Sequence, residues 1–364
     1  MPSASELRID QLTGLRTILA PGRAERPDQF RGAPPAPDPG VAEAKAASCP
    51  FCEGREERTP PELYALRPEG GEPDSPGWVT RVVPNLYPAL GGEAGGEGAP
   101  AAGAAGAGSP GAEAGSFASG GDPLLASRRT GEPDLFSTRP ASGAHEVLIN
   151  SPEHLTAMSE LDEEQFAAAV ATWRERMRAH ADASYVQLIV NEGGGAGASL
   201  EHTHAQLYAL PFVPAAVARE RERAGAYAER TAGSGLLSDV LVEEVRRQER
   251  LVAIDDEAAL ICPWASRSPF ELRVVPRREA ASFADDDAGA GMIRTALRTL
   301  AARFDGPPEL NLWVRTAPSG ADRFHWHVDV APRLTIKAGF ELGTGVDINV
   351  YPPERAASDL RDCL

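Results

Sequence analysis

Lysine is almost absent from this chain, and positive charge is scarce overall. Only Lys45 and Lys337 are lysines, and 36 basic side chains stand against 53 acidic ones, which gives a formal net charge of −17. Proteins that bind nucleic acids neutralise backbone phosphates with basic side chains, so a chain this acidic is poorly suited to that task. The charge balance therefore argues against a nucleic-acid partner.

Long hydrophobic runs are also missing. No stretch of the 364 residues approaches the roughly 20 consecutive apolar residues that a bilayer-spanning helix needs. The first ten residues, Met-Pro-Ser-Ala-Ser-Glu-Leu-Arg-Ile-Asp, lack the apolar core of a secretory signal. We therefore expect a cytoplasmic protein that has no membrane partner and is long enough to bury a substantial core.

Cysteine occurs only four times, which is no basis for a disulfide framework. Two cysteines stand alone, whereas Cys49 and Cys52 form a Cys-Pro-Phe-Cys pair. A pair at this spacing can supply two of the four ligands of a tetrahedral zinc ion from one tight turn. Two more ligands must come from elsewhere, and His154 and His202 are the best-placed candidates.

A long low-complexity stretch interrupts the first half of the chain. Residues 91–121 are nearly all Gly, Ala, Glu, Ser and Pro, a composition that cannot bury enough apolar surface to order itself. We interpret residues 91–140 as a disordered insertion in a surface loop.

Outside the insertion, the chain repeats one pattern of elements. Each copy runs strand, strand, helix, strand, loop and a strand with a His-x-His motif. Antiparallel strands with intervening helices predict an α+β fold, built from a duplicated domain with helices packed on a mostly antiparallel sheet. The helices are predicted over 162–180 and 289–304, the motifs are His202-Thr-His204 and His325-Trp-His327, and the halves are 1–215 and 216–364.

The first motif extends into His202-Thr203-His204-Ala205-Gln206. On a strand, alternation would place His202, His204 and Gln206 on one face. Three polar side chains in register need a reason, because burying them without partners is costly. A catalytic or ligand-binding face would supply that reason.

A glycine-rich loop, Asn191-Glu-Gly-Gly-Gly-Ala-Gly-Ala-Ser199, comes directly before this motif. Such a loop lets the backbone approach a ligand and turn its N–H groups toward phosphate oxygens. A neutral imidazole can attack phosphorus and form a phosphoramidate, which divides one displacement into two. A glutamine two residues further can donate to phosphoryl oxygens but cannot act as an acid, which favours transfer to a second substrate over hydrolysis.

These features resemble the galactose-1-phosphate uridylyltransferase family, the transferase branch of the histidine-triad superfamily. The resemblance covers the chain except for the insertion, and includes Ala-Pro-Gly-Arg23-x-x-Arg26-Pro near the start, Val-Val-Pro-Asn85-Leu-Tyr-Pro and Ala-Gly-Phe-Glu341-Leu-Gly-Thr-Gly. It implies His204 as the nucleophile. It also implies Zn²⁺ at Cys49, Cys52, His154 and His202, and substrate contacts from Arg23, Arg26, Asn85, Asn191, Ser199, Gln206 and Glu341.

The activity implied by this resemblance is that of a UDP-glucose–hexose-1-phosphate uridylyltransferase of galactose metabolism. His204 would attack the α-phosphorus of UDP-glucose, glucose 1-phosphate would leave, and galactose 1-phosphate would attack the uridylyl-histidine. The expected partners are thus a nucleotide sugar and a sugar 1-phosphate. A homodimer is expected because the family's active sites use segments of both subunits.

Two departures from the family pattern leave alternatives open. Thr203 stands between the histidines where the best-known members have proline, and Gly-Ala-Ser-x-x-His-x-His-x-Gln also resembles plant relatives that act as ADP-glucose phosphorylases. The alternatives are therefore an ADP-glucose phosphorylase or adenylyltransferase on the same scaffold, or a non-catalytic nucleotide-binding zinc protein.

The remaining histidines receive structural interpretations. Some relatives carry a second metal near the later motif, here His325 and His327, but the additional histidine expected upstream is replaced around Val314. We therefore interpret His325 and His327 as a structural echo of the duplication. His145 and His180 are predicted to be surface residues.

Overall fold

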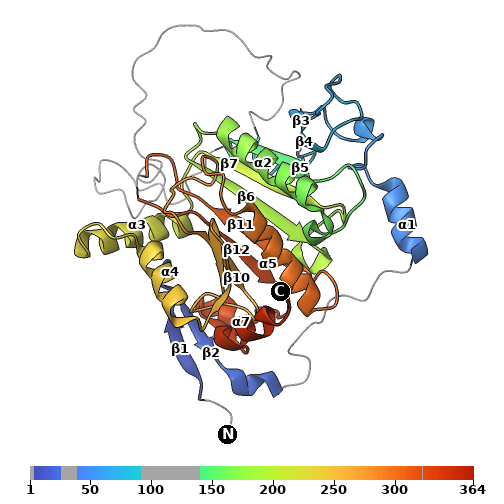
Figure 1. The fold of residues 1–364 in the computed structure, drawn as a ribbon. Helices are drawn as coiled ribbons and strands as arrows, with labels where there is room; N and C mark the ends of the chain where they lie inside the picture. The colour runs from blue at the N-terminus through green and yellow to red at the C-terminus, as the bar shows by residue number, and fades with distance from the viewer. Residues whose placement is uncertain (1–3, 26–38, 92–139, 322) are drawn as a thin grey trace, which may run out of the picture.

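The computed structural model describes residues 4–25, 39–91, 140–321 and 323–364 (Figure 1). The proposed insertion at 91–140 lies, apart from its two end residues, outside the described residues. Arg26, one of the two arginines expected near the phosphates, also lies outside them.

The centre of the fold is a ten-stranded sheet in which every neighbouring pair is antiparallel. In strand β6 (Tyr185–Glu192), for example, alternation directs Val186, Leu188 and Val190 to the apolar face of the sheet. In spatial order the strands are β3 (Tyr64–Leu66), β4 (Thr80–Pro84), β5 (Ala144–Ile149), β7 (His204–Leu210), β6 (Tyr185–Glu192), β11 (Leu310–Arg315), β12 (His327–Pro332), β10 (Leu272–Pro276), β9 (Ala258–Ile261) and β8 (Leu251–Ile254).

The strand order is the same when it is followed inward from either edge. From one edge it runs β3-β4-β5-β7-β6, and from the other β8-β9-β10-β12-β11. The two halves meet where β6 pairs with β11, with Asn191 opposite Asn311. The expected α+β fold and its duplication are confirmed, whereas the boundary at residue 215 stays a prediction.

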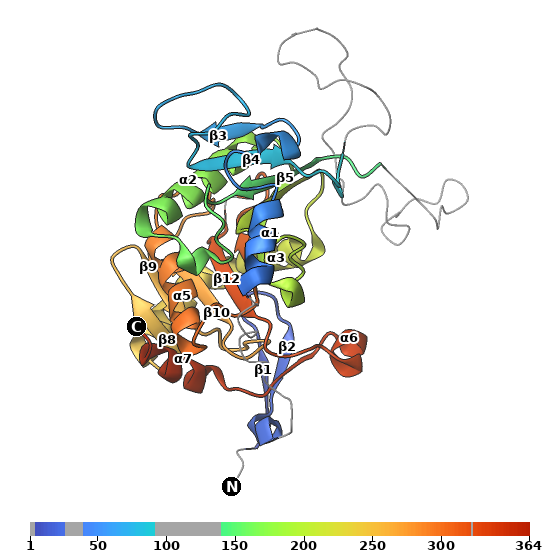
Figure 2. The same ribbon diagram turned by 90° about the vertical axis from the view of Figure 1, so that its right-hand side faces the viewer.

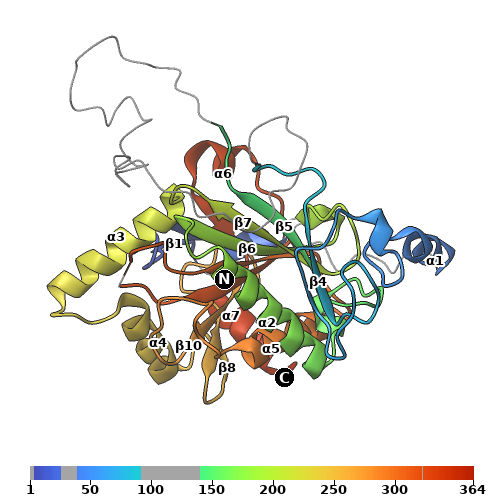
Figure 3. The same ribbon diagram turned by 90° about the horizontal axis from the view of Figure 1, so that it is seen from above.

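Two long helices, α2 (Glu163–Ala179) and α5 (Ala290–Arg303), cover one face of the sheet and lie side by side (Figures 1 and 3). Both were predicted within one or two residues, and Asp162 caps α2 by accepting a hydrogen bond from the Gln165 N–H at 2.8 Å. Their apolar faces and the sheet form the main core. Large members of this core include Phe166, Trp173, Leu188, Leu207, Phe283, Ile293, Leu300 and Trp326.

A small second sheet and five further helices surround this body. Strand β13 (Asp347–Asn349) pairs in parallel with β2 (Arg16–Leu19), which pairs with β1 (Glu6–Ile9), so an early and a late segment of the chain share this sheet. Figure 2 shows β1 and β2 below the main sheet, on the side of the N-terminus. Within the described ranges no helix combines the length and apolar character needed to cross a bilayer. The other helices are α1 (Pro39–Ser48), α3 (Ala215–Arg230), α4 (Leu236–Arg247), α6 (Gly339–Thr344) and α7 (Pro353–Arg361).

Strand β7 separates the expected functional face from the core. Ala205 and Leu207 are fully buried in the main core, so His204 and Gln206 point to the opposite face. The strand begins at His204, so His202 lies in the segment before it and not on the strand as expected. The polar residues predicted to act therefore lie on the face away from α2 and α5.

Candidate active site and metal group

Four side chains from three segments converge beside the start of β7. Cys49 and Cys52 lie in the turn after α1, His154 lies in the loop after β5, and His202 precedes β7. One donor atom from each side chain lies within 4.8 Å of all the others. The structure thus brings together the two cysteines and the two histidines that the sequence suggested as partners.

The sulfur–nitrogen distances of this group fit a tetrahedral metal site. Nδ1 of His202 lies 3.6 Å from Sγ of Cys49 and 3.7 Å from Sγ of Cys52, and Nδ1 of His154 lies 3.4 Å from Sγ of Cys52. Bond lengths of about 2.3 Å to sulfur and about 2.0 Å to nitrogen give a tetrahedron edge of roughly 3.6 Å. The donor set and its spacing therefore suit a zinc-sized ion.

The tautomer of His202 also favours metal binding. Its Nε2 lies 2.8 Å from the Ser151 carbonyl oxygen, which can only accept, so Nε2 carries the proton and Nδ1 turns its lone pair toward the sulfurs. Burial lowers the pKa of His202 to about 4. Burial and the neighbouring Cys49 raise the pKa of Cys52 to about 11, and a bound cation would oppose that rise by stabilising the thiolate.

His204 is held as a neutral imidazole whose Nε2 has no hydrogen-bond partner among the described residues. Its Nδ1–H donates to the carbonyl oxygen of His202 at 2.7 Å, so Nε2 carries the lone pair. Burial lowers the pKa of His204, and its ring makes an edge contact with Phe51 at a centroid distance of 5.4 Å. This tautomer suits a nucleophile.

Thr203 is turned away from this face. Its hydroxyl accepts from Nδ2 of Asn150 at 3.3 Å, and its N–H donates to the Leu155 carbonyl at 2.7 Å. A proline could not make the second bond, because it has no N–H. Thr203 therefore ties the loop of His154 to the motif.

His145 lies between Gln206 and Asn85 and contacts both. Nε2 of His145 lies 3.0 Å from Oε1 of Gln206 and 3.1 Å from Nδ2 of Asn85, and the ring stacks on Tyr208 at 4.0 Å. The prediction that His145 is a surface residue was wrong, since it is only 8% exposed. No local signal in the sequence marks this burial, because His145 comes to lie opposite Tyr208 only through the pairing of β5 with β7.

The glycine loop is fixed by the second half of the chain. Asn191 Oδ1 accepts from Nδ2 of Asn311 at 2.8 Å, and the Gly195 N–H donates to Oε1 of Glu309 at 2.7 Å. A Cβ at Gly195 would lie 2.1 Å from Oε2 of Glu309, so a larger residue there would displace this carboxylate. Ser199 is exposed, and its expected phosphate contact stays a prediction.

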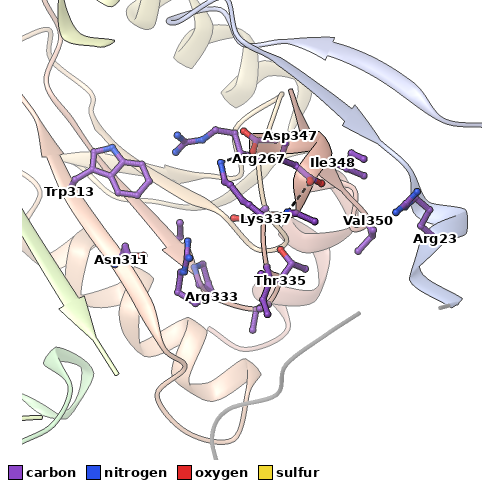
Figure 4. Close-up of a pocket in the computed structure, with 17 residues that line it drawn as sticks. Arg23, Arg267, Asn311, Trp313, Arg333, Thr335, Lys337, Asp347, Ile348 and Val350 are labelled. Carbon is purple, nitrogen blue, oxygen red and sulfur yellow. Dashed lines mark hydrogen bonds and ion pairs between the residues drawn. The ribbon is translucent and has the colours of Figure 1, made fainter. Parts of the chain in front are cut away.

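Arg23 and Glu341 lie elsewhere, in a cavity of about 390 Å³ (Figure 4). Lys337, Arg333 and Asn311 also line it, whereas His204 and Gln206 do not. Basic side chains in one cavity suit an anionic ligand. The structure therefore divides the predicted substrate contacts between the face of β7 and this cavity.

The later histidines make hydrogen bonds of their own. His325 Nε2–H donates to the Pro276 carbonyl at 2.9 Å, and its Nδ1 lies 3.2 Å from the Ser238 hydroxyl. His327 Nδ1–H donates to the His325 carbonyl at 3.2 Å. Within the described ranges, one group of three or more His, Cys, Asp or Glu side chains is placed to hold a metal ion. It consists of Cys49, Cys52, His154 and His202.

Several known proteins are similar to this chain in sequence. Residues 121–214 match the family model for galactose-1-phosphate uridyl transferase, N-terminal domain. An ADP-glucose phosphorylase of Arabidopsis thaliana is 30% identical over 374 residues, covering 98% of this chain and 92% of the relative. A galactose-1-phosphate uridylyltransferase of Thermotoga maritima is 26% identical, covering 62% of this chain and 76% of the relative.

Solved structures agree. The Arabidopsis thaliana ADP-glucose phosphorylase with bound ADP-glucose superposes with a TM-score of 0.73 at 26% identity, covering 99% of both chains. A uridylyltransferase structure superposes with a TM-score of 0.64 at 22% identity, covering 99% of this chain and 98% of the other, and shows the same fold. Fold and site together define a nucleotidyltransferase of the histidine-triad superfamily. The chain belongs to the galactose-1-phosphate uridylyltransferase family, as its motifs indicated.

Proposed function

We propose that the protein transfers the adenylyl group of ADP-glucose through a covalent intermediate on His204 and passes it to inorganic phosphate, in the cytoplasm. The observation that carries the covalent step is the fixed tautomer of His204, whose Nδ1–H is bonded to the His202 carbonyl and whose Nε2 is free to attack. The choice of donor is supported by the near full-length similarity to an ADP-glucose phosphorylase. The Gly-Ala-Ser-x-x-His-x-His-x-Gln sequence supports the same choice.

The reaction balances in two displacements. Nε2 of His204 attacks the α-phosphorus, the bond to the β-phosphate oxygen breaks, and glucose 1-phosphate leaves. The nitrogen–phosphorus bond then breaks when a phosphate oxygen attacks, which releases ADP and restores the imidazole. Gln206 Nε2 donates to a phosphoryl oxygen and stabilises the charge that develops there.

We further propose that Cys49, Cys52, His154 and His202 hold Zn²⁺. The ion would supply structural rigidity by linking the turn after α1 to the segment before β7. His202 would then contribute twice, because its Nδ1 faces the sulfurs while its carbonyl accepts from His204. The metal group would therefore fix the position of the nucleophile.

The cavity around Arg23 suggests how a homodimer would complete the site. Lys337 and Glu341 line it, but the nucleophile does not. Phe340 and Leu342 of α6, close to the cavity lining, expose 47% and 76% of their surface, although both are large and apolar. We propose that this region of one subunit faces the His204 site of its partner. Light scattering at micromolar concentration should give twice the monomer mass of 38.5 kDa.

A second candidate is the UDP-glucose–hexose-1-phosphate uridylyltransferase activity of galactose metabolism. The match of residues 121–214 to the uridyl transferase model supports it. So does the presence of both a basic cavity and Glu341, which together could hold a sugar 1-phosphate.

One labelling experiment separates these candidates and the non-catalytic alternative. The protein is incubated with ADP-glucose or UDP-glucose carrying ³²P at the α-position, without acceptor. Acid-labile label from ADP-glucose that phosphate releases as ADP supports the first candidate. Label from UDP-glucose that galactose 1-phosphate releases supports the second. Label in a His204→Gly variant, or none in the wild type, would overturn covalent catalysis.

A further inference from the structure

The amide of Gln206 is held by its oxygen alone. Oε1 accepts from the Tyr208 hydroxyl at 2.9 Å and lies 3.0 Å from Nε2 of His145. No described residue accepts from Gln206 Nε2. The side chain therefore has one occupied end and one end available to a ligand, on the same strand face as His204.

Backbone contacts determine which nitrogen of His145 carries the proton. The Ala89 N–H, which can only donate, points at Nδ1 at 3.2 Å. Nδ1 therefore accepts and the proton sits on Nε2, which donates to Oε1 of Gln206. The contact with Asn85 Nδ2 is then no hydrogen bond, and Oδ1 of Asn85 is engaged by the Tyr87 N–H at 2.9 Å.

We propose that His145 and Tyr208 are positioning residues: two hydrogen bonds to Oε1 turn the NH₂ group of Gln206 toward the reacting phosphoryl group. An unheld amide can rotate by 180° and present its oxygen, which would repel phosphoryl oxygens. Holding it in advance removes the cost of reorienting it during the reaction. The ring stack between His145 and Tyr208 keeps the two donors in one arrangement.

This inference rests on the proposed function for the identity of the group that Gln206 contacts. The tautomer of His145 does not depend on it. Burial lowers the pKa of His145, which agrees with the neutral ring that the Ala89 contact requires.

The test is a double-mutant cycle on the rate of ³²P labelling. His145→Phe keeps a ring against Tyr208 and removes the donor. We expect it to slow labelling about tenfold or more, with the dissociation constant for the donor within about twofold of wild type. In a Gln206→Ala background, His145→Phe should slow labelling by less than about a further twofold, because the amide that His145 positions is already absent. Equal slowing in both backgrounds, or no slowing in either, would overturn the proposal.

Two further measurements distinguish a positioning role of His145 from an effect on folding and from failure of the proposed function. His180→Phe removes another imidazole, which is hydrogen-bonded to Glu146 and not to Gln206, and should label at the wild-type rate. Nitrogen NMR of His145 should show the proton on Nε2 even if neither nucleotide sugar labels the protein. A proton on Nδ1 overturns the inference alone, whereas absence of labelling in the wild type overturns the proposed function.

Discussion

The two halves of the sheet hold their histidine pairs by the same backbone hydrogen bonds and put them to different uses. His204 and His327 each begin the corresponding strand, and each donates from Nδ1 to the carbonyl two residues before it. His202 and His325 each donate from Nε2 to a backbone carbonyl. The duplication therefore extends to the tautomers of the imidazoles.

The difference lies in what surrounds them. Nδ1 of His202 faces two sulfurs, whereas Nδ1 of His325 faces the Ser238 hydroxyl. Two residues after the second histidine, the first half has Gln206 and the second half has Asp329, which pairs with Arg273 at 2.7 Å. One backbone arrangement thus holds the candidate active site in one half and a buried ion pair in the other.

The largest expected effect tests whether only one half is catalytic. His204→Gly should reduce acid-labile labelling by about 10⁴-fold or more, because no other imidazole replaces the nucleophile. His327→Gln should retain labelling per folded molecule, since Nε2 of His327 faces Glu220 and Asp329, at 3.6 Å and 3.7 Å, in the second half. Labelling is measured after quantifying folded protein by circular dichroism. Loss of labelling in folded His327→Gln would make the second half part of the reaction.

Metal content is the next distinction. Cys52→Ser removes a ligand from the first-half group, and bound zinc should fall from about one per chain to near zero, with a lower melting temperature. Ser238→Ala alters the corresponding contact of His325 and should leave the metal content unchanged. Plasma emission spectroscopy on protein purified without chelator measures both. Full metal in Cys52→Ser would contradict the ligand set.

The residue two positions after the second histidine should matter mainly for stability in one half and mainly for activity in the other. Asp329→Ala leaves Arg273 buried without its partner and should lower the free energy of unfolding by about 3–5 kcal/mol. Gln206→Ala removes a partly buried neutral amide, so it should cost only about 1 kcal/mol while slowing labelling about 10²-fold. Urea unfolding and labelling rates check the pair. Similar stability losses in both variants would show that the halves are not specialised in this way.

The sequence allowed the duplicated fold and the metal group to be predicted because both rest on local patterns. Alternation, helix periodicity and ligand spacing are readable within short windows, as in the Cys49–Cys52 turn and the helix that became α2. The parallel pairing of β13 with β2 was not predicted, because nothing local specifies a partner more than 300 residues away.

His145 and the ion pair of Arg273 with Asp329 show why other contacts could not be predicted from the sequence. A histidine on a predicted strand was assigned to the surface because its hydrogen-bond partners, Ala89 and Gln206, come from other segments. The ion pair of Arg273 with Asp329 likewise depends on strand register. Contacts of this kind arise from the assembled sheet, so they become visible only when the strands are in place.

The smallest expected effect concerns a carboxylate in the first half. Burial alone would raise the pKa of Glu146, but hydrogen bonds from His180 and Arg176 outweigh it and hold the pKa below its ordinary 4.5. A lowered pKa means that the stabilisation is complete above the unfolded-state value and is lost as pH falls through the folded-state value. Glu146→Gln should therefore lower the free energy of unfolding by about 1–3 kcal/mol near neutral pH.

That cost should shrink as the solution is acidified below pH 4.5, since the wild-type carboxylate then takes up its proton. Urea midpoints of wild type and Glu146→Gln, measured at several pH values, give the difference directly. Glu175→Gln is the matched control, because its pair with Arg178 is about half exposed and should contribute little at any pH. A difference for Glu146 that widens in acid would mean that the carboxyl is protonated in the folded protein and that burial, not its two donors, governs it.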